Sequence, residues 1–167
     1  MRPRNVLALC LAIVLAAAPA IAQQSDAAKT PKSAKPAAGE PVFMPASDVK
    51  WVDLDPKGAP GVKIADLWGD HTKGPYGAYL KLPAGFTTPL HTHTYAMKVV
   101  FVSGTYLQRP EGKSEVRLGP GSYMMQPGGK YKHITSCDKA ADCVLFVESS
   151  GPFDLKPVET GTATAKK

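Results

Sequence analysis

The residues best suited to chemistry in this chain are three of its four histidines. His91 and His93 are separated by one residue, and His133 follows a second turn rich in glycine and proline. Side chains alternate between the two faces of a β-strand, so both rings of the pair would leave the same face of a sheet. One metal ion can then reach both rings, and a neighbouring strand can bring the third alongside. The spacing therefore predicts a metal site with His91, His93 and His133 as ligands.

Three neutral imidazoles leave open positions on a bound ion, which is the arrangement that metal-dependent catalysis uses. Imidazole nitrogen suits iron, zinc, nickel, copper or cobalt, whereas magnesium and manganese favour oxygen ligands. We therefore expect a divalent transition metal as cofactor, with iron as the first choice and zinc, nickel or copper as alternatives. The competing interpretation is a fold that kept its histidines as polar lining and binds no metal.

The histidine pair belongs to a longer pattern of spaced residues. Gly85 is followed after five residues by His91-Thr92-His93, then after three residues by Met97 and after six more by Gly104.

A second pattern surrounds the third histidine. Gly121 is followed after five residues by Pro127-Gly128-Gly129, then after three residues by His133 and after three more by Cys137. In these two patterns the chain resembles the cupin superfamily, and it is similar to a group of exported bacterial single-domain cupins. The resemblance implies a jelly-roll barrel with a metal in its mouth, held by the three histidines.

The chain departs from the cupin pattern at the glutamate ligand. Strict counting puts Met97 at that place, and a shift by one residue puts Lys98 there. Met97 alternates with Val99 and Phe101, so barrel core is its first interpretation; as a thioether ligand it would favour copper. Lys98 is expected to face solvent or an acidic partner. If it faced inward, it would indicate an anionic, carboxylate-bearing ligand.

Five residues are candidates for the lining of a pocket or for places beside the site, with ordinary core as the alternative: Met97, Lys98, Phe101, Tyr106 and Gln126. His71 lies in a polar turn, so we expect it at the surface. No carboxylate stands near the three histidines in the sequence. No general acid or base is therefore predicted.

Cys137 and Cys143 are the two cysteines of the predicted mature chain, since Cys10 lies in the apolar N-terminal run. An oxidising compartment favours a disulfide between them. The alternative is that Cys137, which replaces the cupin asparagine, is a thiolate near the metal.

The elements that must position these residues are short strands. Strands are predicted at 49–54, 62–68, 78–82, 97–102, 116–118, 122–126 and 144–147, most of them bounded by glycine or proline. No window has a helical period. Many short strands at regular spacing indicate a sandwich or barrel, and a double-sheet jelly roll protects strand edges. We predict an all-β, double-stranded β-helix (jelly-roll) barrel in one domain.

The rest of the chain predicts an exported protein. Residues 1–22 have a basic start, a short apolar run and a small-residue cleavage site, so we expect a signal peptide and a periplasmic or secreted protein. Residues 23–41, rich in alanine, lysine and proline, are predicted to form a flexible linker. The barrel is expected over 42–158 and a disordered tail over 159–167.

Charge argues against nucleic acid as a partner. The whole chain has a net charge of +6, but residues 41–158 hold 13 Lys and Arg against 11 Asp and Glu, a net charge of +2. A nucleic-acid module would cluster basic residues on its folded domain. We expect no membrane contact after signal removal, a small-molecule ligand or substrate, and, from the cupin resemblance alone, a homodimer.

Two classes of function remain open. The first is an exported metal-binding cupin acting on a small molecule, with three-histidine dioxygenase-like oxidation or lyase and isomerase chemistry. The second is a non-catalytic binding or sensing module for a metal or small ligand.

Overall fold

The computed structural model describes residues 39–159. Contacts divide the chain into two units, residues 1–42 and 43–167, and only residues 39–42 of the first are described. The predicted signal peptide, nearly all of the predicted linker and all but the first residue of the predicted tail lie outside the described residues. The second unit is therefore described by itself.

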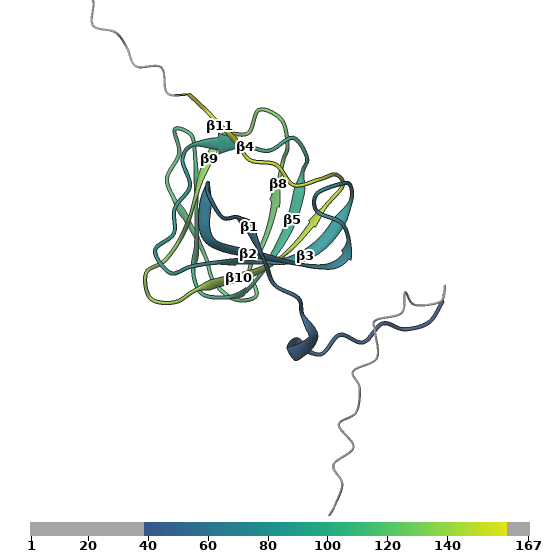
Figure 1. Cartoon of the computed structure of the whole chain (residues 1–167). Coiled ribbons are helices and arrows are strands. Elements are labelled where there is room, and N and C mark those ends of the chain that lie inside the picture. Colours follow the sequence, from purple (N-terminus) through teal and green to yellow (C-terminus); the bar gives the residue numbers. More distant parts are fainter. Residues whose placement is uncertain (1–38, 160–167) are drawn as a thin grey trace, which may run out of the picture. The chain divides into compact units, whose positions relative to one another are not determined.

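Within residues 43–159, the second unit consists of a single 3₁₀ turn (Ala46–Asp48) followed by strands (Figure 1). The strands are β1 (Val52–Asp55), β2 (Ala59–Gly69), β3 (Tyr76–Leu82), β4 (His91–Thr92), β5 (Met97–Ser103), β6 (Tyr106–Pro110), β7 (Val116–Leu118), β8 (Tyr123–Gln126), β9 (His133–Cys137), β10 (Cys143–Ser149) and β11 (Lys156–Pro157). They form two antiparallel sheets, of order β1-β2-β3-β10-β5-β8 and β11-β4-β9-β6-β7. The predicted all-β jelly-roll fold is confirmed.

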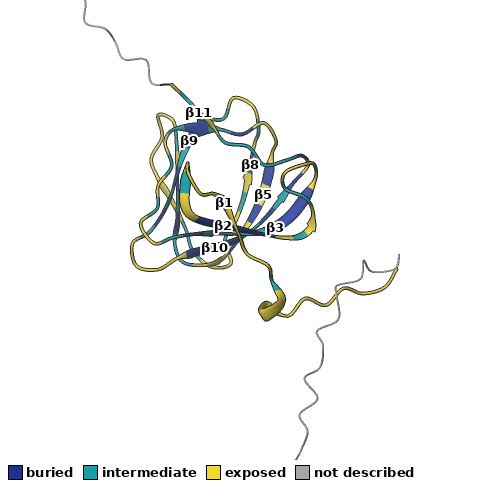
Figure 2. Cartoon of the chain, in the orientation of Figure 1, coloured by how far each residue is buried: buried dark blue, intermediate teal, exposed yellow. Residues whose placement is uncertain are grey.

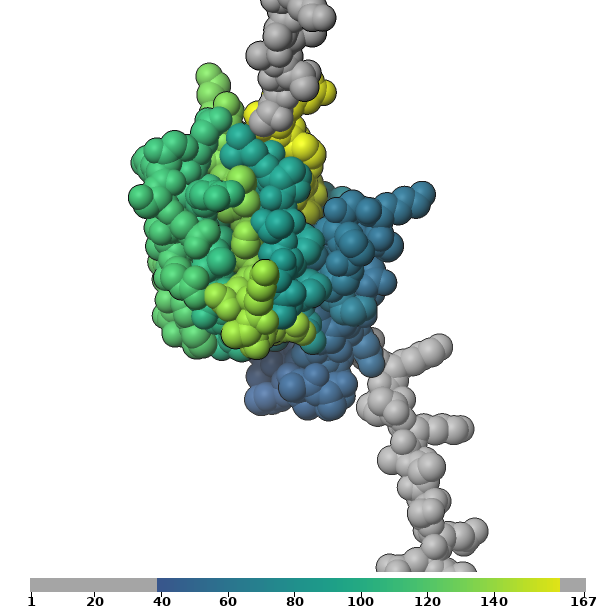
Figure 3. All heavy atoms as spheres, turned by 90° about the vertical axis from the view of Figure 1, so that its left-hand side faces the viewer, coloured from purple at the N-terminus to yellow at the C-terminus, as the bar shows by residue number. Residues whose placement is uncertain are grey.

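The order of strands brings together segments that are far apart in the sequence. In the larger sheet, β10 pairs with both β3 and β5; in the smaller one, β9 pairs with both β4 and β6. A space-filling view of one side shows the middle of the chain, in teal and green, as a closely packed surface (Figure 3). The two histidine segments, β4 and β9, are thereby neighbours in one sheet.

Period-two burial places the core between the sheets (Figure 2). In β5, Met97, Val99 and Phe101 are buried while Lys98 and Val100 are exposed, as the apolar alternation predicts. In β10, Leu145 and Val147 face the same core. The inner face of the larger sheet is therefore almost entirely apolar.

The smaller sheet has a different inner face. In β9 the buried positions are His133, Thr135 and Cys137. Tyr106 and Gln108 of β6 are also buried, and the Tyr106 hydroxyl bonds to the Thr135 hydroxyl at 2.8 Å. The inner face of the smaller sheet is therefore partly polar, and hydrogen bonds between its strands, such as the one that joins Tyr106 and Thr135, satisfy some of its buried groups.

Cys137 and Cys143 form a disulfide that joins the end of β9 to the start of β10. The predicted pairing is confirmed, and Cys137 is therefore not a thiolate. A short disulfide loop of this kind contributes about 2–3 kcal/mol in the chain-entropy estimate. Among residues 39–159, no helix has the length and apolar character needed to span a membrane.

Candidate functional site

The three histidines meet in the smaller sheet. His91 begins β4 and His133 begins β9, and the two residues are directly opposite one another in the antiparallel register. His93 follows β4 by one residue. The centroid of the His91 ring lies 4.8 Å from that of His93 and 4.2 Å from that of His133. The three predicted ligands thus lie within reach of a single ion, with donor atoms all within 4.8 Å of one another.

Backbone carbonyls fix which nitrogen of each ring carries the proton. His91 Nδ1 donates to the Pro89 carbonyl at 2.9 Å, and His93 Nδ1 donates to the Asp154 carbonyl. His133 Nδ1 faces the Tyr131 carbonyl at 3.4 Å. Because a carbonyl only accepts, the proton lies on Nδ1 in each neutral ring. Each Nε2 is left with a free lone pair.

These free lone pairs face one another. His91 Nε2 and His93 Nε2 are 3.1 Å apart, and His133 Nε2 is completely buried and bonds to no described residue. Two unprotonated nitrogens at that distance repel each other, and an unpaired buried acceptor is unfavourable. A divalent cation between the rings would satisfy all three, so the donor set fits a metal ion.

Burial keeps the rings neutral. It lowers the pKa of His91, partly offset by the Pro89 carbonyl. Burial lowers the pKa of His93 to about 4, although the Asp154 carbonyl acts in the opposite direction. Burial, together with the other two histidines, lowers the pKa of His133 to about 3. The protonated form, which would exclude a metal, is therefore disfavoured near neutral pH.

A cavity of about 610 Å³ opens beside the cluster. His91 and His93 contribute to its wall, whereas His133 lies behind them with no exposed area. Most of the wall is apolar, supplied by the inner face of the larger sheet. No lysine or arginine of the described residues lines this cavity.

The other predicted site residues have three different locations. Met97, Tyr106 and Gln126 line the cavity. Phe101 is buried against Tyr106, with ring centroids 4.8 Å apart, and belongs to the core instead of the wall. Lys98 is exposed on the outer face of β5, where it pairs with Glu148 at 3.0 Å. Its inclusion among the pocket candidates was wrong, because strand alternation turns it away from the interior.

Sequence reasoning missed one acidic residue beside the cluster. Asp154, which also lines the cavity, accepts from His93 through its carbonyl and binds the backbone and hydroxyl of Thr94 through its carboxylate. The residue lies in the segment before β11, far from either histidine pattern. No motif marks it, and only the pairing of β11 with β4 brings it near.

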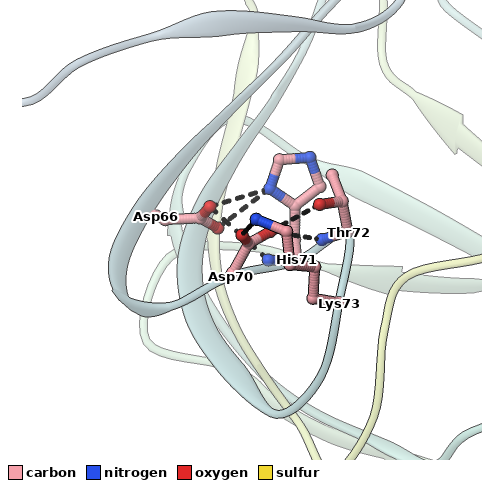
Figure 4. A network of polar contacts seen from close by, with 5 residues as sticks. All are labelled: Asp66, Asp70, His71, Thr72 and Lys73. Atoms are coloured by element: carbon pink, nitrogen blue, oxygen red, sulfur yellow. Dashed lines mark hydrogen bonds and ion pairs between the residues drawn. The ribbon is translucent and has the colours of Figure 1, made fainter.

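A second polar group was also missed. His71, expected at the surface, lines the cavity with a side chain that is 15% exposed, and its Nδ1 lies 2.9 Å from an Asp66 carboxylate oxygen. Figure 4 shows the other ring nitrogen turned away from Asp66. The structure thus brings a titratable ring, bound to a carboxylate, into the cavity wall where the sequence predicted none. No pattern in the sequence marks this pair, because Asp66 is exposed in β2 and His71 follows in a turn.

This chain matches a known protein family. A family model described as "Domain of unknown function (DUF4437)" matches residues 42–167. No curated protein matches the chain significantly.

Several solved structures are similar. The polyketide cyclase RemF from Streptomyces resistomycificus is 18% identical, with a TM-score of 0.59 over 74% of this chain and 89% of that chain. A structure titled for the DMSP lyases RdDddP and RnDddQII is 16% identical, with a TM-score of 0.54 over 66% of this chain and 63% of that one. An RmlC-like cupin from Shewanella frigidimarina is 17% identical, with a TM-score of 0.51 over 66% and 91%.

The chain therefore spans less than two thirds of the length of the lyase chain. At these identities the likenesses show the fold alone.

Proposed function

Since the chain belongs to the cupin superfamily and to its family described as "Domain of unknown function (DUF4437)", we propose that it is an exported, metal-binding cupin acting on a small molecule. The metal ligands are His91, His93 and His133. The ion is a divalent transition metal, with iron preferred and zinc, nickel or copper as alternatives.

One observation carries this proposal: three Nε2 lone pairs converge on one another. His133 Nε2 in particular is buried without a partner. Three Nδ1–H groups held by carbonyls are the usual outer support of metal-binding histidines, because they fix the tautomer and aim the free nitrogen. Among the three Nε2 atoms the only contact at hydrogen-bond distance is that between His91 and His93, at 3.1 Å, and it leaves His133 Nε2 unpaired within the described residues.

The ion would supply Lewis-acid or redox chemistry at positions left open by only three protein ligands. The chain's own residues do the rest. His91 and His93 present the cluster to the cavity, Asp154 holds His93 in place through its carbonyl, and the buried apolar strands keep bulk water away. The absent glutamate is replaced by Met97, whose thioether lies in the cavity wall.

The residues that line the cavity favour an apolar ligand. Val62, Ile64, Ala78, Val99 and Leu145 are among its residues, and the carboxylates of Asp55 and Asp154 are its anionic ones. A substrate with several carboxylates would lack a cationic partner there. The similar structures include a protein named as a polyketide cyclase and others named as DMSP lyases, which supports small-molecule chemistry without choosing the substrate.

Export is part of the proposal. The disulfide between Cys137 and Cys143 is typical of an oxidising compartment, and it supports a periplasmic or secreted location for a mature chain beginning near Gln23.

Elemental analysis of the mature, untagged protein tests the metal site. We expect near-stoichiometric metal in the wild type and none in a His91→Ala/His93→Ala variant. His71→Ala is the matched control, because it removes the one histidine outside the cluster and should retain the metal. An absence of metal in the wild type, even after reconstitution with iron, zinc, nickel and copper in turn, would overturn the proposal.

The non-catalytic binding module is the second candidate, and the apolar wall is the observation that favours it. Such a module should hold a ligand in the cavity with the ion fully coordinated. An enzyme should keep an exchangeable water on the ion, which water-proton relaxation measures on the copper- or nickel-loaded protein.

A further inference from the structure

The polar group formed by His71 and Asp66 has the construction of a proton-transfer pair. His71 Nδ1 lies 3.0 and 2.9 Å from the two oxygens of the Asp66 carboxylate. A carboxylate only accepts, so it holds the ring proton on Nδ1 and leaves Nε2 as the free acceptor. Nε2 bonds to no described residue, and Figure 4 shows it directed away from both neighbouring aspartates.

His71 connects this pair to the cavity. Its side chain is 15% exposed and forms part of the cavity wall together with Thr72. Asp66 is an exposed residue of β2 and does not line the cavity, although its register partner in β3, Ala78, does. The carboxylate therefore binds the His71 ring without itself contributing to the wall.

The nearby Asp70 does not compete for this role. Its carboxylate accepts from the backbone and hydroxyl of Thr72 and from Lys73 Nζ at 2.6 Å (Figure 4). Lys73 already neutralises it, so the three residues Asp66, Asp70 and His71 do not need a cation to balance their charge.

One short segment of chain contacts both the His71–Asp66 pair and the three-histidine cluster. The Phe153 amide donates to the His71 carbonyl at 2.7 Å, and the next residue, Asp154, accepts from the His93 ring through its carbonyl. The Phe153 ring lies 5.6 Å from the His93 ring. Adjacent residues are 3.8 Å apart along the backbone, so both groups can contact one small molecule in the shared cavity.

Tyr76 adds a hydrogen-bond donor beside the pair. Its ring is 6.3 Å from the His71 ring, its side chain is buried in the cavity wall, and its hydroxyl bonds to no described residue. Burial, with Asp66 and Asp154 nearby, raises the pKa of Tyr76. The hydroxyl therefore stays protonated and is available to a ligand oxygen.

We propose that His71, positioned by Asp66, is the proton acceptor of the cavity for a largely apolar substrate that carries one oxygen-bearing head. A C–H or O–H bond of the substrate breaks, its proton moves to His71 Nε2, and the electron pair stays on the substrate. The imidazolium so formed is balanced by Asp66, and Tyr76 donates to the substrate oxygen. This inference rests on the proposed function only in sharing its cavity.

An alkylating probe tests the inference without a known substrate. The mature, zinc-loaded protein is treated at pH 8 with a bromomethyl ketone bearing a hexyl chain, and peptides are mapped by mass spectrometry. The carbon–bromine bond breaks, a bond to the attacking nitrogen forms, and bromide leaves. Cys137 and Cys143 are joined in a disulfide, so no free thiol of the described residues competes.

We expect one label, on His71 Nε2, formed at least about tenfold faster than with bromoacetone, because the chain occupies the apolar cavity. Asp66→Asn should slow labelling about tenfold, and Asp66→Glu should restore part of the rate. Asp70→Asn is the matched control in the same loop and should leave the rate unchanged. In nitrogen NMR, His71 of the wild type should carry its proton on Nδ1.

Labelling elsewhere, or equal rates for wild type and Asp66→Asn, would overturn the inference. His71→Gln must abolish the label while circular dichroism and metal content stay at wild-type values, since His71 is no ligand of the cluster. The two proposals fail separately: a protein that binds no metal but labels at His71 refutes the metal site alone, and a metal-loaded protein that does not label refutes the proton acceptor alone.

Discussion

His133 is the residue that most directly links the cluster to a metal. Its ring has no exposed area, and its Nε2 has no partner in the described part of the chain. Leaving a buried acceptor unpaired costs about 1–3 kcal/mol. We therefore predict that His133→Leu raises the free energy of unfolding of the metal-free protein by about 1 kcal/mol, while abolishing stabilisation by added metal.

Urea unfolding with and without zinc measures both effects. Thr135→Val is the control: it removes another buried polar group of β9, a hydroxyl that bonds to the Tyr106 hydroxyl, and should destabilise the metal-free protein. A His133→Leu variant that loses stability as Thr135→Val does would indicate that the ring is a structural core residue and not a ligand.

The same histidines give the metal-free protein a distinct pH dependence. In the unfolded chain they take up protons near pH 6.5, whereas His93 stays neutral in the fold down to about pH 4 and His133 to about pH 3. The contribution of the two neutral rings to the free energy of unfolding is therefore complete above pH 6.5. It is lost as the pH falls from 6.5 toward 4. The expected slope is up to about 1.4 kcal/mol per pH unit for each histidine.

Denaturant unfolding at pH 7.5, 6 and 4.5 measures this slope. Carboxylates with a lowered pKa, such as Asp138, release their contribution below their ordinary value of 3.8 and do not act in this window. A His93→Leu variant should show a shallower slope. An unchanged stability from pH 7.5 to 4.5 would show that the rings are not buried as neutral groups.

At the residue scale, the sequence allowed the cluster to be predicted but not its surroundings. His91, His93 and His133 lie in spaced patterns with glycine and proline, so their convergence could be expected. Asp154 and His71 come from segments without a pattern, and long-range pairing alone brings them to the cavity. Lys98 was placed among the site candidates because the sequence leaves its strand register open by one residue.

At the element scale, the predicted strands include those with apolar inner faces. β5 and β10 alternate Met97, Val99 and Phe101, or Leu145 and Val147, with more exposed residues. β9 was missed because its buried positions include His133 and Thr135, which inverts the usual polarity. β4 and β11 are too short for any period to appear.

The turn that holds His93 depends on a close approach of two loops. Gly129 donates its amide to the His93 carbonyl at 2.8 Å, and a Cβ on Gly128 would clash with the Thr94 carbonyl oxygen. We predict that Gly128→Ala separates these loops, lowers metal affinity about tenfold and destabilises the fold by about 1–3 kcal/mol. Metal titration and urea unfolding measure the two effects.

Gly119→Ala is the matched control for this substitution. A Cβ there meets no heavy atom within 4 Å, so metal affinity and stability should stay close to wild type. If Gly128→Ala keeps wild-type metal affinity while the fold is weakened, the His93 loop is positioned by Asp154 and not by the glycine turn.

At the scale of the whole molecule, the two sheets enclose one cavity of about 610 Å³, and neighbouring residues of β5 lie on either side of its wall. Val99 lines the cavity, whereas Val100 is 42% exposed on the outer face. The neutral apolar dye N-phenylnaphthylamine should therefore bind the wild type, and Val99→Phe, which fills the cavity, should weaken its binding at least about tenfold. Val100→Phe adds the same ring outside and should leave dye affinity unchanged.

Fluorescence titration of the three proteins decides where the dye sits. Because no described lysine or arginine lines the cavity, a carboxylate-bearing analogue of the dye should bind more weakly than the neutral one. Equal loss of affinity in both variants would place the dye outside the cavity. Tighter binding of the carboxylate form would mean that a positive charge, such as a metal held by the histidines, dominates ligand selection over the apolar wall.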